Sequence, residues 1–167
     1  FSISGEAQGT TYHISYYATD SLVSRAAVEQ VFSEIDSSLS IYKSYSRISR
    51  FNQSEKGILM DKHLAKVVQA SLEIYRETGG ISDITVYPLV NAWGFGPVKP
   101  NAAPDSTTIH NILPCIGAGK LHISQNWLLK DQPCVQIDLN GIAQGYTVDL
   151  LADLLEAKNI RNYLVEV

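Results

Sequence analysis

The sequence predicts an α+β domain whose sheet is mostly antiparallel and packed with helices. Short extended segments alternate with single amphipathic helices, and most connections between successive strands are short. Short connections favour antiparallel pairing, because a parallel pair needs a long crossover. We expect residues 1–167 to form a single domain, with residues 134–167 as its only parallel β-α-β crossover.

The chain is expected to begin with a β-hairpin and a helix. Residues 3–7 and 12–16 are extended, alternate in polarity, and are separated by Gly9. Residues 24–39 carry apolar side chains at helical spacing, and Ser24 is a candidate N-cap. An amphipathic helix of this length needs a sheet or another helix to cover its apolar face.

Residues 40–52 have no clear period and are expected to be irregular. A second helix should begin at Asp61 and end at Gly79–Gly80, where glycine provides the usual stop signal. Residues 81–90 are rich in β-forming residues and are expected to form a strand, followed by a sharp turn at residues 93–97.

The second half of the chain is expected to begin with a loop, residues 98–110, which has no period. A meander should follow, with Gln125–Asn126 as the turn between its first two strands. Residues 134–139 are expected to form a further strand, and a glycine-bracketed loop at 141–145 leads into a third helix. The final strand is expected at residues 163–167.

The composition excludes several classes of protein. Hydrophobic residues make up 45% of the chain, and 13 basic against 17 acidic residues give a net charge of −4. No run of Lys or Arg is present, which argues against nucleic-acid binding, and no apolar stretch reaches the roughly 20 residues of a membrane span. Phe1–Gly5 lacks the basic and apolar regions of a signal peptide, so we expect any targeting sequence to lie outside these residues.

Cysteine and histidine give no metal or nucleophile signature. Cys115 and Cys134 could form one disulfide or remain two buried thiols, because a sequence does not reveal the Cα separation that a bridge requires. The four histidines lack ligand spacing, which argues against zinc, and no GxSxG elbow is present.

Three segments carry residues that could bind a ligand, and each has a structural alternative. Residues 138–146 combine a carboxylate, two glycines and a helix start, which suits either a phosphate site or a tight turn. Asp83 follows Gly79–Gly80 and could bind a ligand or only cap the backbone. The aromatic residues of segment 93–97 could stack on a ring or pack in the core.

Four segments, in order, resemble motifs of the ApbE family of FAD:protein FMN transferases. Ala7–Tyr12 resembles A-M-G-T-x-Y, and residues 39–52 resemble M-S-T-Y followed by E-I-S-R-F-N. Asp83–Pro97 resembles D-x-T-V-G-P-L-V-N-x-W-G-F-G-P, and Asp138–Asp149 resembles D-L-G-G-I-A-K-G-Y-A-V-D. The resemblance runs nearly the whole length and implies a T-fold-like ApbE architecture.

The resemblance also implies an activity. ApbE enzymes use FAD and Mg²⁺ to transfer FMN to a Thr or Ser hydroxyl of a partner flavoprotein, a subunit of a membrane redox complex, and release AMP. They work in the periplasm or on the outer face of the inner membrane, commonly as lipoproteins held only by a lipid anchor. FAD pyrophosphatase activity and non-catalytic flavin binding are the alternatives.

The resemblance assigns site residues by motif position. It implies that FAD contacts seven side chains: Gln8, Tyr42, Ile81, Ser82, Asp83, Asp138 and Gln144. Gly141 falls where a backbone carbonyl helps to hold Mg²⁺. The family chain is about twice as long as this one, so the catalytic residues and the other metal ligands are expected beyond Val167. Among the predicted FAD contacts, three differ from the residue usual in the family: Gln8 replaces Met, Ser82 replaces a bulky apolar residue and Gln144 replaces Lys.

Overall fold

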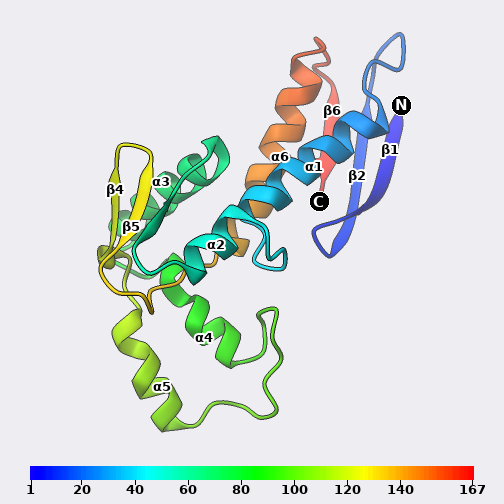
Figure 1. Cartoon of the computed structure of the whole chain (residues 1–167). Coiled ribbons are helices and arrows are strands. Elements are labelled where there is room, and N and C mark those ends of the chain that lie inside the picture. Colours follow the sequence, from blue (N-terminus) through cyan, green and yellow to red (C-terminus); the bar gives the residue numbers. More distant parts are fainter. The chain divides into compact units, whose positions relative to one another are not determined.

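The computed structural model describes all 167 residues, which divide into two compact units. Unit 1 consists of residues 1–36 and 141–167, and unit 2 consists of residues 37–140. Each unit contains a three-stranded antiparallel sheet and helices (Figure 1). The protein is therefore of the α+β class, and none of its helices is both long and apolar enough to span a membrane.

The sheet of unit 1 has the order β1-β2-β6, with β1 at Ser2–Ala7, β2 at Thr10–Tyr16 and β6 at Tyr163–Glu166. Helices α1 (Arg25–Leu39) and α6 (Asn140–Glu156) contribute side chains to the core against this sheet. The buried core consists of Tyr12, Ile14, Tyr16, Val23, Val28, Phe32, Leu151, Leu155 and Ile160. Burial of these large apolar side chains drives the packing of helix on sheet.

The sheet of unit 2 has the order β3-β5-β4, with β3 at Gly57–Leu59, β4 at Leu121–Ser124 and β5 at Trp127–Lys130. Four α-helices accompany it: α2 (Arg47–Gln53), α3 (Lys62–Glu77), α4 (Tyr87–Ala92) and α5 (Ser106–Ile112). Three 3₁₀ turns complete the unit: η1 (Ile84–Val86), η2 (Leu113–Cys115) and η3 (Ala118–Lys120).

The N-terminal hairpin, three of the helices and the β4–β5 hairpin are confirmed. Ser24 Oγ accepts the N–H of Ala27 at the start of α1, and Asp61 caps α3. Gly79 and Gly80 both have positive φ, of 61° and 89°, which suits a helix stop that only glycine adopts without strain. In α1 and α3 the apolar periodicity and the cap indicate the same helix start.

Three local expectations are wrong. Residues 40–52 are not irregular throughout, because α2 begins at Arg47 behind Ser46, whose Oγ accepts the N–H of Ser49. Residues 81–90 form η1 and α4 rather than a strand; Pro88 lies in the first turn of α4, where its missing N–H costs nothing. Loop 98–110 ends early, because Asp105 caps α5 through the N–H of Thr108.

The expected parallel crossover is also wrong. Cys134 lies in a turn, residues 135–139 belong to no helix or strand, and β6 pairs antiparallel with β2. The glycine-bracketed segment 141–145 is not a loop, because α6 already begins at Asn140. The strand pattern of 134–139 reflects burial of Val135, Ile137 and Leu139 on one side, and side chains supply the hydrogen bonds that a neighbouring strand would otherwise give.

Candidate functional site

The segments that carry Asp83 and Asp138 lie next to each other in unit 2. The N–H of Asp138 donates to the carbonyl oxygen of Ile84 at 2.8 Å, and Ile84 directly follows Asp83. Ile84 belongs to η1, whereas Asp138 lies near the end of the segment 134–139. This main-chain bond holds the Asp83 and Asp138 segments side by side, although they are far apart in sequence.

Both carboxylate oxygens of Asp83 accept hydrogen bonds from other residues of the chain. Its Oδ1 accepts the N–H of Thr85 at 2.8 Å and the Thr85 hydroxyl at 2.6 Å, and its Oδ2 accepts the N–H of Ala118 at 3.1 Å. The hydroxyl oxygen of buried Thr85 also accepts the N–H of Gly117. Asp83 therefore caps η1 and fixes the 117–118 loop, which is the structural alternative that the sequence left open.

Asp138 is half-buried, and its Oδ1 accepts the N–H of Asn140 at 2.8 Å. Burial raises the pKa of its carboxyl, against the lowering effect of the Asn140 hydrogen bond. Burial likewise raises the pKa of the Tyr87 phenol, and the nearby Asp138 and Tyr42 raise it further. Tyr42, Tyr87 and Asp138 therefore form one polar cluster next to Asp83.

Tyr42 lies in the turn between α1 and α2, and more than half of its side chain is exposed. Its hydroxyl donates to the carbonyl oxygen of Phe95 at 3.1 Å, which joins this turn to the segment after α4. Ser46 closes the same turn, because its Oγ donates to the carbonyl oxygen of Ser40 at 2.7 Å.

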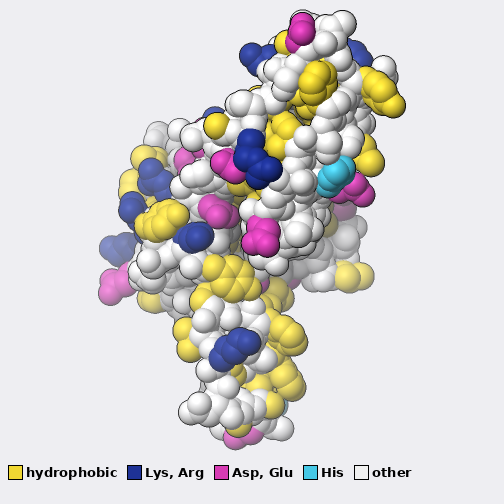
Figure 2. Space-filling view, turned by 90° about the vertical axis from the view of Figure 1, so that its right-hand side faces the viewer, with side chains coloured by type: hydrophobic (Ala, Val, Ile, Leu, Met, Phe, Trp, Pro, Cys, Tyr) yellow, Lys and Arg dark blue, Asp and Glu magenta, His cyan; other side chains and the backbone are white.

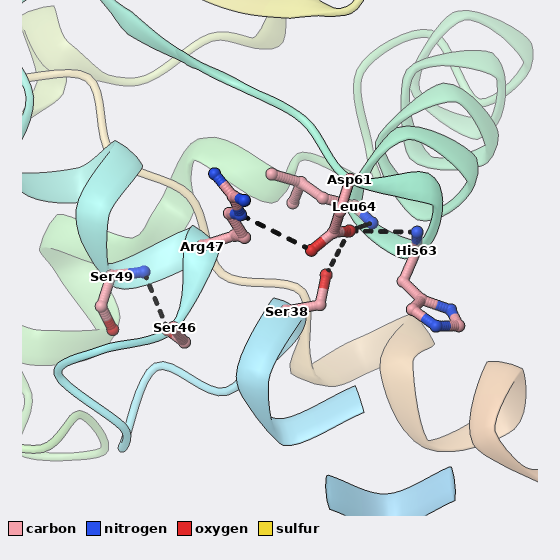
Figure 3. A network of polar contacts seen from close by, with 7 residues as sticks. All are labelled: Ser38, Ser46, Arg47, Ser49, Asp61, His63 and Leu64. Carbon is pink, nitrogen blue, oxygen red and sulfur yellow. Dashed lines mark hydrogen bonds and ion pairs between the residues drawn. The ribbon is translucent and has the colours of Figure 1, made fainter. Parts of the chain in front are cut away.

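A network around Asp61 fixes the two ends of that turn (Figure 3). Asp61 Oδ1 accepts the Ser38 hydroxyl at 2.7 Å and the N–H groups of His63 and Leu64 at 3.1 and 2.8 Å. Its Oδ2 lies 3.9 Å from Arg47 Nε. One carboxylate thus links the end of α1 and the starts of α2 and α3, so the turn with Tyr42 has fixed ends.

Ile81 and Ser82 both point into solvent. The side chain of Ile81 is 90% exposed, and Ser82 is exposed next to it. The N–H of Ser82 donates to Thr78 Oγ1 at 3.2 Å, which anchors the residue to the end of α3. These two predicted residues form a surface segment that leads directly into Asp83.

The remaining predicted residues belong to unit 1 and gather near the start of α6. Gln8 has a φ of 53°, and its Nε2 donates to Thr147 Oγ1 at 3.0 Å. Gln144 is exposed, and its Nε2 donates to the carbonyl oxygen of Val167 at 3.0 Å. Gly141 is exposed in the first turn of α6, with no atom near the position that a Cβ would take.

The described residues do not form a metal site. No group of three or more His, Cys, Asp or Glu side chains is placed to hold a metal ion. The carbonyl of Gly141 would be one ligand at most, and Mg²⁺ requires six oxygen ligands in octahedral geometry. Residues 1–167 therefore do not fit a complete Mg²⁺ site by themselves.

The aromatic residues after α4 are exposed rather than packed in the core. Trp93 is 54% exposed and Phe95 is 73% exposed. Figure 2 shows hydrophobic side chains on the surface of the part of unit 2 that contains α4, α5 and the segment between them. The prediction that these aromatic side chains pack in the core is therefore wrong, and stacking on a ring stays a prediction.

The two cysteines form a disulfide. Cys115 and Cys134 are joined, with their Cα atoms 5.5 Å apart. Cys115 precedes the loop that donates to Asp83 and Thr85, and Cys134 begins the segment that ends at Asp138. The bridge thus connects the loop that bonds to Asp83 with the segment that carries Asp138.

Sequence reasoning missed two residues close to Asp138 or to its main-chain neighbour, Tyr87 and Asn52. Tyr87 stands where the motif D-x-T-V-G-P has Gly, and this departure was the available signal. Asn52 is buried, and its side-chain amide makes two hydrogen bonds to the main chain of Ile137, which precedes Asp138. Its motif position was visible in the sequence, but its partner was not.

Comparison with known proteins shows similarity over nearly the whole chain. A model of the ApbE family matches residues 8–167. An FAD:protein FMN transferase from Vibrio cholerae is 36% identical over 172 residues, which cover 99% of this chain and 52% of the relative. The chain therefore spans about half the length of the curated relatives it matches.

Two solved structures are similar in fold. The flavin transferase ApbE from Vibrio cholerae has a TM-score of 0.94 at 34% identity, and the match covers 100% of this chain and 56% of that one. The apo form of the Pseudomonas stutzeri flavinyl transferase ApbE has a TM-score of 0.92 at 32% identity, with the same coverage.

Proposed function

The chain belongs to the ApbE family, and from that premise we propose that it is the FAD-binding part of an FAD:protein FMN transferase. The observation that carries the proposal is the bond between Asp138 N–H and the carbonyl oxygen of Ile84, which brings the Asp83 and Asp138 segments together. A carboxylate held in this way, as that of Asp138 is, suits the hydroxyl and ring N–H groups of a flavin nucleotide.

The proposed residue roles follow from burial and bonding. Asp138 accepts a hydrogen bond from FAD, because its half-buried carboxylate is poorly solvated and gains from a bound donor. Tyr42 and the exposed pair Ile81 and Ser82 contact the flavin nucleotide from the neighbouring surface. Asp83 acts mainly through its capping bonds, which keep the Ile84 carbonyl in place for Asp138.

We further propose that Gln8, Gly141 and Gln144 contact the FAD diphosphate. They lie near the start of α6, where main-chain N–H groups lack helical partners. The positive end of a helix favours an anion. Mg²⁺ is part of this proposal, with Gly141 as one ligand and its carboxylate ligands outside residues 1–167.

In the proposed reaction, a Thr or Ser hydroxyl of a partner flavoprotein attacks the phosphorus on the FMN side of the FAD diphosphate. The new P–O bond forms as the bond to the bridging oxygen breaks; AMP leaves, and the hydroxyl proton is lost to base or solvent. We propose a subunit of a membrane redox complex as the acceptor. The site of action is the outer face of the inner membrane, with a lipid anchor outside this chain.

The disulfide supports that location, because such bonds persist in oxidising compartments and are rare in the cytosol.

The deciding experiment incubates the full-length protein with FAD, Mg²⁺ and an acceptor protein. Covalent FMN on the acceptor supports the transferase. Free FMN and AMP without labelling would indicate an FAD pyrophosphatase, and unchanged FAD would indicate a flavin-binding protein without this activity.

A further inference from the structure

The segment before Asp138 is buried, but no strand pairs with it. The side chains of Val135 and Ile137 are both fully buried. A buried main-chain N–H or C=O without a partner is costly, so this segment needs donors and acceptors from elsewhere. Two side chains provide them: Lys130 and Asn52.

Asn52 satisfies both main-chain groups of Ile137. Its Nδ2 donates to the carbonyl oxygen of Ile137 at 2.9 Å, and its Oδ1 accepts the N–H of Ile137 at 2.8 Å. The carbonyl oxygen of Asn52 in turn accepts Nε2 of Gln136 at 3.0 Å. The amide thus imitates one residue of a neighbouring strand, and Asn52 itself is buried in the last turn of α2.

Asp138 is consequently held from two directions. Asn52 fixes the residue before it, and the Ile84 carbonyl fixes its own N–H at 2.8 Å. Both sets of hydrogen bonds involve main-chain groups, so neither uses the carboxylate oxygens of Asp138. The position of that carboxylate therefore depends on α2, although α2 carries none of the residues proposed to bind FAD.

We propose that Asn52 is the positioning residue of Asp138 and thereby controls the affinity for FAD. This inference rests on the proposed function. It requires a side-chain amide at the length of asparagine, because the amide offers a donor and an acceptor in one plane and the longer glutamine would place them about one methylene further along. Leu would fill a similar volume but leave both main-chain groups of Ile137 unpaired. An ionised Asp would keep the acceptor and lose the donor.

The test compares three variants of the full-length protein: Asn52→Leu, Asn52→Asp and, as a control, Val68→Ala. Val68 is a fully buried residue of α3, so its truncation destabilises unit 2 by creating a cavity. It forms none of the hydrogen bonds around Ile137. FAD affinity is measured by flavin fluorescence well below the thermal unfolding midpoint of each variant, and hydrogen exchange is followed over residues 134–139.

We expect Asn52→Leu to weaken FAD binding by about tenfold or more and to speed up hydrogen exchange at Ile137 and Asp138. Asn52→Asp should recover part of the affinity, because it keeps the acceptor for the Ile137 N–H. Val68→Ala should lower the unfolding midpoint but leave the FAD affinity within about twofold. A purely structural role would instead make Asn52→Leu behave like Val68→Ala.

FAD binding by the unaltered protein separates the proposed function from the positioning role of Asn52. If the unaltered protein does not bind FAD, the proposed function is wrong and the inference is overturned with it. If the unaltered protein binds FAD, and Asn52→Leu binds it equally well, the proposed function stands and only the positioning role is overturned. Unchanged exchange at Asp138 in Asn52→Leu would likewise overturn it.

Discussion

Asp138 donates its main-chain N–H to the carbonyl oxygen of Ile84 at 2.8 Å, which couples a half-buried carboxylate to the segment capped by Asp83. Asp83 in turn accepts the N–H of Ala118, so three separate parts of unit 2 meet at this point. The consequence is a carboxylate whose location is well determined while its charge is poorly solvated. Such a poorly solvated carboxylate lowers the stability of the fold, and groups of this kind are concentrated at ligand-binding sites.

The first prediction is that Asp138→Asn weakens FAD binding without destabilising the fold. The amide keeps an oxygen for the N–H of Asn140, and it removes a charge that burial disfavours. Loss of a charge-assisted hydrogen bond of about 1.5–3 kcal/mol corresponds to roughly 10- to 100-fold weaker binding. Titration with FAD and denaturant unfolding at pH 7 measure the two effects. Unchanged affinity would contradict the role of Asp138.

The pH dependence of stability gives this prediction a definite sign. Burial raises the folded-state pKa of Asp138, so the folded protein holds this proton more tightly than the unfolded chain does. Its contribution to the free energy of unfolding therefore decreases as the pH rises from its ordinary value near 3.8 through the raised pKa. Asp138→Asn should remove that decrease, which a series of unfolding curves across this range would detect.

Sequence reasoning succeeded where local and long-range signals agree. The helix beginning after Asp61 has a cap, an apolar stripe and a glycine stop, and each of these is visible in neighbouring residues. The antiparallel pairs β1–β2 and β4–β5 followed from their short connections, because a short loop cannot join two parallel strands. The sequence also offered backbone capping as one role for Asp83, and its bond to the Thr85 N–H confirms that role. The assignment of Asp83 and Asp138 to FAD stays a prediction.

It failed where a distant side chain decides the local structure. Residues 134–139 alternate like a strand, but the amide of Asn52 and the ammonium of Lys130 bind their main chain instead of a neighbouring strand. No periodicity within that segment encodes such partners. The β-forming residues of 81–90 were misjudged for a local reason, because Asp83 caps η1 and Pro88 suits the first turn of α4, and these two signals outweigh β propensity.

The second prediction concerns Lys130, whose ammonium is buried and donates to the carbonyl oxygens of Phe51, Pro133 and Val135. We expect Lys130→Met to lower the free energy of unfolding by about 1–3 kcal/mol for each carbonyl left without a partner. Denaturant unfolding measures the loss. Lys158→Met, at an exposed position, is the matched control and should change stability by less than about 0.5 kcal/mol.

Lys130 also has a testable pH signature. Burial lowers its pKa from 10.5 to about 8. Between these two values the unfolded chain binds more protons than the folded protein, so the contribution of Lys130 to stability increases as the pH rises. Below about pH 8 both states are protonated and the contribution is constant. The difference in unfolding free energy between the unaltered protein and Lys130→Met should show this change of slope.

The third prediction is that Gln144→Lys is tolerated. Gln144 is exposed, and its only bond given by the structure is to the carbonyl oxygen of Val167, which a lysine ammonium can also donate to. A positive charge near a diphosphate should maintain or increase the affinity for FAD. Calorimetric titration at low and high salt provides the measurement. Abolished binding would mean that Gln144 does not face the diphosphate.

The last prediction concerns the Cys115–Cys134 disulfide, which joins residues 19 positions apart. A bridge that closes a loop of this size stabilises a protein by about 3 kcal/mol, largely by restricting the unfolded chain. Cys134 is exposed, so a dithiol reductant should reach the bond. We therefore expect reductant to lower the unfolding midpoint of the unaltered protein and to have no effect on a Cys115→Ser, Cys134→Ser double variant.

Breaking the bridge should also weaken FAD binding, and the reason is local. Cys115 leads into the Gly117–Ala118 loop that donates to Thr85 and Asp83, and Cys134 begins the segment that ends at Asp138. Without the disulfide, the loop that bonds to Asp83 and the segment that carries Asp138 are no longer joined covalently. The folded double variant should therefore bind FAD several-fold more weakly. Equal affinity at a temperature where the variant is fully folded would show that the hydrogen bonds of Asn52 and Ile84 hold Asp138 without help from the bridge.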